Sequence, residues 1–435
     1  MLEKLFKLSE HGTNVKKELI AGLITFLTMS YVLIVNPVIL GETGMDKAAL
    51  FTSTAIACVA GTLLMAFLAN IPIALGPGMG LNSFFASTVV LTMGYSWQFA
   101  LTAVFIEGLI FIVLTALNVR KVIMDKMPKV LKSAIPVGVG IFIAFIGLQQ
   151  SGLIVRSEHT MLTLGSLADR GVWVTLAGLL VTGISLARNI PGAILIGILT
   201  ATVFGLFLGI TRMPESNLIA LPPNISPIFA KFEWTHIFSF DMLIVVFTFL
   251  FVNLFDTVGT LIGVASKAGL LDKNKNLPQA KKAFYADSLA TTFGAIIGTS
   301  TITAYVESTA GVASGGRTGL TSVGTAMMFF LAIFFAPVFL LVPIQATATA
   351  LIIVGLFMLS SVVEINFNDF TESVPAFLTI IMMPFAYSIA QGIIFGILGF
   401  VLIKTFSGRA KEVSAAVYVV AALFLIKIIT DYCFV

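Results

Sequence analysis

Charged residues are scarce in this chain of 435 residues. Asp, Glu, Lys and Arg make up 11% of it, whereas hydrophobic residues make up 58%. Soluble domains carry about 25% charged residues, so a water-soluble fold of this size would lack the polar groups to cover its apolar surface. A lipid bilayer solvates such a surface, and spanning segments of about 20 apolar residues are helices. The composition therefore predicts an all-α polytopic membrane protein.

Cysteine and histidine are also rare, with two and three residues respectively. Cys58 falls in an apolar segment and Cys433 close to the C-terminus, so no disulfide framework is expected. His11, His159 and His236 fall in predicted loops or at membrane edges. The sequence shows no metal-ligand spacing, no Ser/His/Asp set and no phosphate-binding loop. It predicts neither an enzyme nor a bound cofactor or metal.

What the chain does contain is a series of long apolar segments. Three of them are interrupted by Gly, Pro, Ser and Thr, at 71–93, 283–299 and 300–316. Each of the others is long enough to cross a bilayer as a helix. These uninterrupted spans are predicted near 18–38, 51–70, 98–118, 132–150, 172–188, 191–211, 241–264, 318–341, 345–363, 373–388, 389–406 and 413–433.

Basic residues are concentrated in a few connections, and these give the orientation. The N-terminus and the loops 119–132, 267–282 and 404–411 are rich in Lys and Arg, so we expect them in the cytoplasm. The stretches 151–171 and 212–240 are less basic and are expected outside. The net charge of +4 follows from this bias and does not indicate nucleic-acid binding. We expect a multi-pass protein of the cytoplasmic membrane with its N-terminus inside.

Weak sequence matches recur in the same order in the two halves of the chain. Thr25-Phe26-Leu27 matches Thr248-Phe249-Leu250, and residues 76–80 can be aligned with 307–311. The order predicts two repeats of about seven spans each, inverted in the membrane because the number is odd. The predicted units are one membrane domain, 1–435, that contains the repeats 15–211 and 241–406 and an additional C-terminal helix, 413–433.

The interrupted segments 71–93 and 300–316 occupy corresponding positions in the two repeats. In inverted-repeat transporters the binding site lies near the midplane, where such helices are broken. Free backbone groups are tolerated there only when they line a cavity, and half-helix N-termini present the positive end of the helix dipole. We therefore expect the site between these two segments.

Four acidic residues lie within apolar segments, where each costs about 2.5–3.5 kcal/mol on insertion scales. Asp256 lies deep in its span, and Glu307 lies at the break of 300–316. Asp287 is predicted to begin an interrupted helix, where a structural and a functional role are equally supported. Glu107 lies away from the breaks, so a structural hydrogen bond to a neighbouring helix is favoured for it.

Two buried carboxyls beside broken helices suit a flat, neutral ligand with paired N–H donors, such as a nucleobase. A carboxylate accepts two such bonds side by side, and charge-assisted hydrogen bonds are the stronger class. Structural roles stay open, because Asp256 can bond a neighbouring threonine and Glu307 can cap a half-helix. Burial disfavours a charged carboxyl, so one of the two is predicted to carry a proton. Candidates to stack on the ring are Phe26, Tyr31, Phe84 and Phe255.

Five runs of the sequence carry a resemblance to a known family, and together they extend over about residues 10–430. They are residues 22–31, 76–85, 105–108, 255–260 and 300–308. With these runs the chain resembles the nucleobase–cation symporter-2 family and, within it, the AzgA-like purine permeases.

The resemblance implies about 14 spans in a 7+7 inverted repeat, the architecture described for many transporters. A core domain would hold the spans near 18–118 and 241–341, and a gate domain those near 132–211 and 345–406. The implied activity is import of guanine, hypoxanthine or adenine by proton symport, with an elevator-like movement of core against gate. A homodimer is compatible with the family, and no residue decides it.

The resemblance also implies roles for individual residues. The uracil and xanthine branches carry Glu where this chain has Asp256, and the shorter side chain leaves room for a bicyclic ring. Proton coupling would involve Asp256, Glu307 and Asp287. The implied substrate-binding residues are Asp256, Glu307, Ser308, Thr309, Gly78, Met79 and Gly80, beside the walls Phe26 and Phe255.

Two other classes of membrane protein remain open from the residues. Sulfate-type anion transporters share the inverted-repeat architecture, but an anion site should present positive charge rather than two carboxyls. A channel would line its pore with polar rings. Competition by purines but not sulfate would separate the transporters, and saturable, pH-gradient-dependent uptake would exclude a channel.

Overall fold

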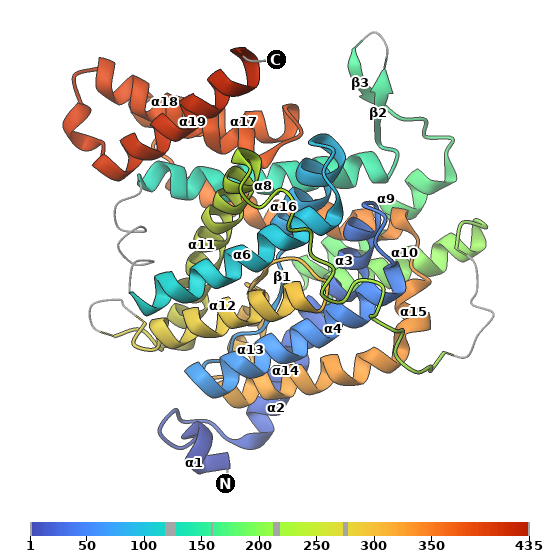
Figure 1. Ribbon diagram of the computed structural model, residues 1–435. Coiled ribbons are helices and arrows are strands. Elements are labelled where there is room, and N and C mark those ends of the chain that lie inside the picture. The colour runs from blue at the N-terminus through green and yellow to red at the C-terminus, as the bar shows by residue number, and fades with distance from the viewer. Residues whose placement is uncertain (1, 118–127, 158–159, 212–217, 273–276, 434–435) are drawn as a thin grey trace.

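The computed structural model describes residues 2–117, 128–157, 160–211, 218–272 and 277–433. Most of them lie in helices packed side by side (Figure 1). Within these residues, nine helices are long and apolar enough to cross a membrane. The predicted multi-pass helical architecture is therefore confirmed. Four shorter apolar helices accompany them, at Met79–Thr92, Ala193–Phe207, Phe370–Phe385 and Ala415–Ile426.

The elements follow the predicted segments in order. In the first half they are α1 (Leu2–Phe6), α2 (Val15–Met29), α3 (Val32–Gly41), α4 (Lys47–Leu64) with a π-helical end (Met65–Ala69), β1 (Leu75–Pro77), α5 (Met79–Ser83) with a π-helical continuation (Phe84–Thr92), α6 (Trp97–Ala116), α8 (Lys129–Gln150), β2 (Ile154–Ser157), β3 (Met161–Leu164), α9 (Arg170–Ala187) and α10 (Ala193–Phe207). In the second half they are α11 (Phe240–Ala268), α12 (Ala280–Ile296), β4 (Ile302–Ala304), α13 (Ser308–Ala313), α14 (Gly319–Ala332), α15 (Ala336–Leu340), α16 (Ile344–Met358), α17 (Phe370–Phe385), α18 (Ile389–Phe406) and α19 (Ala415–Cys433), with 3₁₀ turns at Ile333–Phe335, Leu359–Glu364 and Ala410–Glu412.

Several helix ends follow directly from local sequence. Helices α4, α6 and α11 begin after Asp46, Ser96 and Ser239, whose side chains accept a hydrogen bond from the backbone N–H three residues later. Helix α11 ends at Gly269, which has a φ of 70°. Glycine adopts this left-handed conformation without steric cost, so it terminates the helix there.

The two broken segments meet as an antiparallel pair of strands. Strand β1 pairs with β4, with Leu75 opposite Ala304 and Pro77 opposite Ile302. The Gly78 N–H donates to the Thr301 carbonyl at 3.0 Å and extends the pair by one bond. Each strand runs into a half-helix, α5 after β1 and α13 after β4. The breaks predicted in 71–93 and 300–316 are confirmed, and the strands join the two halves of the chain.

The break predicted at 283–299 is wrong, because α12 is continuous over Ala280–Ile296. The hydroxyl groups of its polar residues form hydrogen bonds within the helix. Ser288 and Thr292 donate to carbonyls four residues back at 2.7 and 2.9 Å. Asp287 consequently lies in the middle of a helix and not at its start. The predicted repeat alignment also shifts, since Gly78 and Glu307 each immediately precede a half-helix and therefore correspond.

The helices pack as two groups that agree with the expected core and gate. Helices α2, α4, α6, α11, α12 and α14 form one packed group, and α8, α9, α10, α16, α17 and α18 form the second group. Glycines bring helices close within each group. A Cβ on Gly22 of α2 would lie 2.6 Å from the Thr321 carbonyl of α14, and one on Gly140 of α8 would lie 2.8 Å from the Gly355 carbonyl of α16. Small residues at crossings are typical of helix packing in membranes.

Core and gate contact each other where α5 and α11 meet α8, where α3 meets α16 and where α2 meets α10. A Cβ on Gly80 would lie 2.5 Å from Cγ1 of Val139. Helix α19 lies beside α18 of the gate (Figure 1) and also contacts α11 of the core. Its Tyr418 hydroxyl is 2.8 Å from Oγ1 of Thr405 on α18, and its Phe424 ring packs edge-on against Phe247 of α11.

Candidate functional site

Asp256 and Glu307 line one cavity of about 520 Å³, which we call cavity A. Asp256 comes from α11, and Glu307 immediately precedes α13. Cavity A continues into a narrower space between the two half-helices, and Gly78, Met79 and Gly80 line that space together with both carboxyls. The structure therefore brings together the two acids and the glycine run that were expected to form the site.

Glu307 is held in place by a tyrosine. The Tyr31 hydroxyl, at the junction of α2 and α3, donates a hydrogen bond of 2.6 Å to Oε1 of Glu307. The neighbouring Tyr305 hydroxyl donates to the Pro77 carbonyl, and the two rings lie 6.5 Å apart and line the same narrow space. Tyr31 thus orients one carboxylate oxygen of Glu307.

Asp256 is held less tightly. Oγ1 of Thr303, on β4, lies 3.4 Å from Oδ2 of Asp256 and is its hydrogen-bond donor. The alternative structural role predicted for Asp256 was a bond to Thr257 or Thr260. The Thr257 hydroxyl instead contacts other groups, 2.9 Å from Oδ1 of Asp287 and 2.9 Å from Oγ1 of Thr303. Asp256 therefore lines cavity A, and its hydrogen bond from Thr303 lies beside the narrow space that both residues line.

A fully buried chain of hydrogen bonds lies next to Asp256 and Thr303, on the side away from cavity A. Glu107 of α6 accepts from Nδ2 of Asn253 at 2.9 Å and from Oγ1 of Thr301 at 2.6 Å. Asn253 Oδ1 in turn lies 2.9 Å from Oγ1 of Thr257, which reaches Asp287. The structural role predicted for Glu107 is confirmed, because it joins α6 to α11 and to the segment before β4. Asp287 belongs to this buried chain of hydrogen bonds and lines neither cavity A nor the narrow space beside it.

The two half-helices offer different backbone groups. The first N–H groups of α5 have no acceptor within the helix, and Gly78 has no side chain to cap them. At α13, in contrast, the N–H groups of Ser308, Thr309 and Ala310 donate to the carbonyls three residues earlier at 2.9–3.1 Å. The α5 end therefore presents donors to the narrow space, whereas the α13 end presents the Glu307 carboxylate as an acceptor.

The other predicted site residues lie elsewhere. Ser308 is buried, and its Oγ accepts from the Ala74 N–H at 3.0 Å, so it supports β1. The expectation that Phe26 lines the site is wrong. Its ring points from α2 toward α14 and packs edge-on against Phe329, with the ring centroids 5.0 Å apart. Phe84 similarly packs against Phe249 at 4.8 Å. The side chain of Phe255 lies outside the described residues.

A second cavity, cavity B, has a volume of about 450 Å³. It is lined by Thr28 of α2, Asn189 in the turn between α9 and α10, and Thr309 and Ala313 of α13. Glu307 lines cavity B as well as cavity A. Of the predicted site residues, Thr309 therefore faces cavity B and not the carboxyl pair.

Comparison with known proteins identifies the family. Residues 16–395 match the profile of a family described as "Permease family". The chain belongs to the nucleobase–cation symporter family of permeases. Adenine permease AdeQ of Escherichia coli is 44% identical over 428 residues, which cover 98% of this chain and 96% of that permease. Guanine/hypoxanthine permease PbuG of Bacillus subtilis is 44% identical over 440 residues, which cover 98% of this chain and 99% of that permease.

Solved structures agree with the fold. The transmembrane domain of a cyanobacterium bicarbonate transporter, BicA, superposes with a TM-score of 0.62 over 88% of this permease and 97% of that domain, at 16% sequence identity. The inverted-repeat fold is therefore shared with transporters of other substrates. Since the family consists of transporters, the expectation that the chain is not an enzyme is confirmed.

Proposed function

We propose that this permease imports purine nucleobases by proton symport. The observation that carries the proposal is the pair Asp256 and Glu307 in one cavity, facing the first turn of α5. The carboxyls accept hydrogen bonds from ring N–H and amino groups, and the α5 N–H groups donate to ring nitrogens or a carbonyl oxygen. Adenine, guanine and hypoxanthine present both kinds of group in one plane, and purines are the substrates named for the relatives.

Proton coupling follows from the same pair. Asp256 and Glu307 line the same cavity, and two like charges in one cavity disfavour double ionisation. A proton on one of them relieves the repulsion and readies the pair for a neutral ligand. Intramembrane carboxyls that reach a water-filled cavity are typical of proton pathways. We infer that Asp256 or Glu307 carries the proton and that Asp287 supports the pair from behind.

An elevator-like movement is supported by the unequal access to the site. Cavity A extends to Lys132 and Glu364, at the end of the molecule that carries the basic connections expected in the cytoplasm. In the other direction, Gly80 and Leu81 pack against Val139 and leave a space of only about 10 Å³. We infer an inward-open state, from which core and gate must slide past each other to open the outer side.

Uptake by Asp256→Asn and Glu307→Gln variants tests the proposal in a host without purine permeases. Each variant loses a charge-assisted bond worth about 1.5–3 kcal/mol, so uptake of labelled hypoxanthine or adenine should fall by roughly tenfold or more. Asp46→Asn is the matched control, because asparagine keeps the helix cap. Unlabelled purines should compete, and sulfate and bicarbonate should not. Undiminished proton-coupled uptake in both variants would refute the proposal.

A further inference from the structure

The two cavities meet at α13. Cavity A is lined by residues of α8, α11 and α16, and cavity B by residues of α2, the α9–α10 turn and α13. Among the described residues, Glu307 and Phe357 of α16 line both cavities. Val306 faces cavity A, whereas Thr309 and Ala310 face cavity B. Glu307 can therefore be reached from either side of the half-helix.

The substrate belongs to cavity A, because Asp256 lines cavity A and not cavity B. A purine held between Asp256 and Glu307 fills the approach to Glu307 from cavity A. Cavity B is lined by Glu307 but not by Asp256, and Thr28, Asn189 and Ser314 are among its polar lining residues. Its volume of about 450 Å³ is large against the ≈ 30 Å³ that a water occupies in the liquid.

We propose that cavity B is a proton route, separate from the path of the purine through cavity A. The inference rests on the proposed proton symport and adds the path that the proton takes. The carboxyl O–H bond of Glu307 breaks, a water in cavity B takes the proton, and the carboxylate that remains is stabilised by the Tyr31 hydroxyl. Among the described residues, the titratable groups that act on Glu307 are Tyr31, Tyr305 and Asp256.

Two matched substitutions separate the routes. Ala313 is exposed in cavity B, so Ala313→Phe narrows that cavity without displacing packed atoms. Gly263 lines cavity A, where an added Cβ would meet no atom within 4 Å, so Gly263→Phe is its counterpart. Neither residue is one of the carboxyls or of the groups that hold them. Ala313→Ser, which keeps the cavity open and polar, is the folding control.

The measurement uses purified protein in liposomes with a pH-sensitive dye inside. Gradient-driven uptake requires the proton to be released, whereas exchange of labelled for unlabelled purine at equal pH requires only the purine to leave and rebind. Ala313→Phe should lower gradient-driven uptake by roughly tenfold, as expected for an apolar constriction in a water path, and leave exchange within about twofold of the wild type. Gly263→Phe should lower both rates.

Two outcomes for Ala313→Phe would overturn the proposal. An equal loss of uptake and exchange would make cavity B part of the purine path, and unchanged rates for both would mean that it carries neither. The wild type tests the underlying function separately. If purine uptake by wild-type protein moved no protons, proton symport itself would fail, whatever the variants did.

Discussion

Glu307 and Asp256 face the same cavity but are oriented with different strength. Glu307 accepts a short bond from Tyr31, at 2.6 Å, whereas Asp256 is 3.4 Å from Thr303. Hydrogen bonds to charged groups contribute about 1.5–3 kcal/mol. Tyr31 therefore orients Glu307 before a ligand arrives, while Asp256 can adjust its position to the ring that binds.

Replacing Tyr31 by phenylalanine removes only the hydroxyl that orients Glu307. We expect the KM for purine uptake to rise roughly tenfold, because the carboxylate must then be ordered by the ligand itself. Uptake measured over a range of hypoxanthine concentrations checks this. Tyr418→Phe is the control, since it also removes a hydroxyl from a hydrogen bond, but on α19. An unchanged KM in Tyr31→Phe would show that the 2.6 Å bond does not serve binding.

Sequence alone could single out Asp256 and Glu307, because a carboxyl in an apolar segment is costly wherever its helix is placed. The direction of a side chain is a different matter. Phe26 and Ser308 face a neighbouring helix and a strand because of how their helices are rotated, and no local pattern records that rotation. One phenylalanine among 38 carries little information about a binding site.

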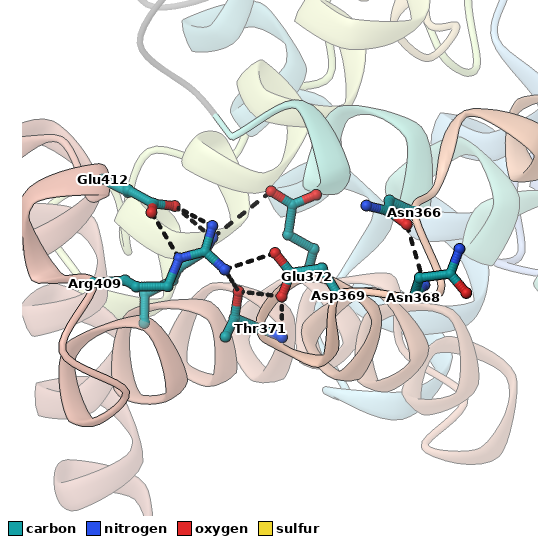
Figure 2. Close-up of polar contacts among 8 residues, drawn as sticks. Asn366, Asn368, Asp369, Thr371, Glu372, Arg409 and Glu412 are labelled. Carbon is teal, nitrogen blue, oxygen red and sulfur yellow. Dashed lines mark hydrogen bonds and ion pairs between the residues drawn. The ribbon is translucent and has the colours of Figure 1, made fainter.

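Outside the membrane, ion pairs tie the end of α18 to the start of α17. Figure 2 shows Arg409 between Asp369 and Glu412, with bonds of 2.7 Å from Nη1 to Asp369 Oδ2 and 2.6 Å from Nε to Glu412 Oε1. The buried Lys404 also donates to Glu412, at 2.6 Å. Hydrogen bonds from Thr371 and Arg409 lower the pKa of Asp369, and those from Arg409 and Lys404 lower the pKa of Glu412.

The lowered pKa values give the sign of a pH effect. A carboxyl whose pKa is lower in the folded protein stabilises it above the pKa of the unfolded chain and loses that effect as the pH falls. We therefore expect Arg409→Gln to lower the melting temperature slightly at neutral pH, with the difference shrinking below about pH 4. Melting curves of the purified protein in detergent over a pH series provide the measurement.

The matched control is Lys7→Gln. It breaks the exposed ion pair in which Lys7 Nζ lies 3.1 Å from Glu10 Oε2, a pair that joins no two spanning helices. The melting temperature of Lys7→Gln should stay at the wild-type value, because isolated surface pairs contribute little. A difference between Arg409→Gln and wild type that grew toward acid pH would contradict the assignment of these carboxyls.

Segments 71–93, 283–299 and 300–316 looked alike in sequence, yet only the first and third are broken. A strand inside a membrane needs a partner for its backbone groups, and β1 finds β4 more than 200 residues away. Among the described residues, the segment 283–299 forms no strand of its own, and the small residues of α12 allow close helix packing instead. Gly108 of α6 approaches Thr292 of α12 so closely that a Cβ would lie 2.8 Å from the Thr292 nitrogen. The distinction depends on long-range pairing, which local composition cannot supply.

Movement of the whole core against the gate can be tested by joining the two. A Cβ on Gly80 of α5 would lie 3.9 Å from the Cβ of Val139 on α8, within the 3.5–4.5 Å of disulfides. We expect the double variant Gly80→Cys/Val139→Cys, with Cys58→Ala and Cys433→Ser, to lose uptake on oxidation and regain it on reduction. Oxidised and reduced vesicles compared in one uptake assay give the answer.

The control pair lies within the gate. Gly205→Cys on α10 and Thr211→Cys just after it would place their Cβ atoms 3.6 Å apart, and oxidation there should leave uptake intact. Full transport by the oxidised core–gate pair would rule out a sliding mechanism.

At the scale of the molecule, composition and the loop charges were enough to predict a multi-pass helical protein, since both reflect the bilayer as a solvent. The grouping into core and gate came from the family resemblance. The position of α19 could not be predicted either way, because its contacts, Thr405 on α18 and Phe247 on α11, belong to different groups. An apolar helix without a repeat partner can pack anywhere along the bundle.

The pairing of β1 with β4 has a consequence for how such a protein can be assembled. Each repeat supplies one strand whose hydrogen-bonding edge is unsatisfied until the other repeat is in place. Half of the chain alone would leave bare peptide groups at membrane depth, where no water can solvate them. A half-length chain could satisfy these groups only by pairing with a second copy inserted in the opposite direction.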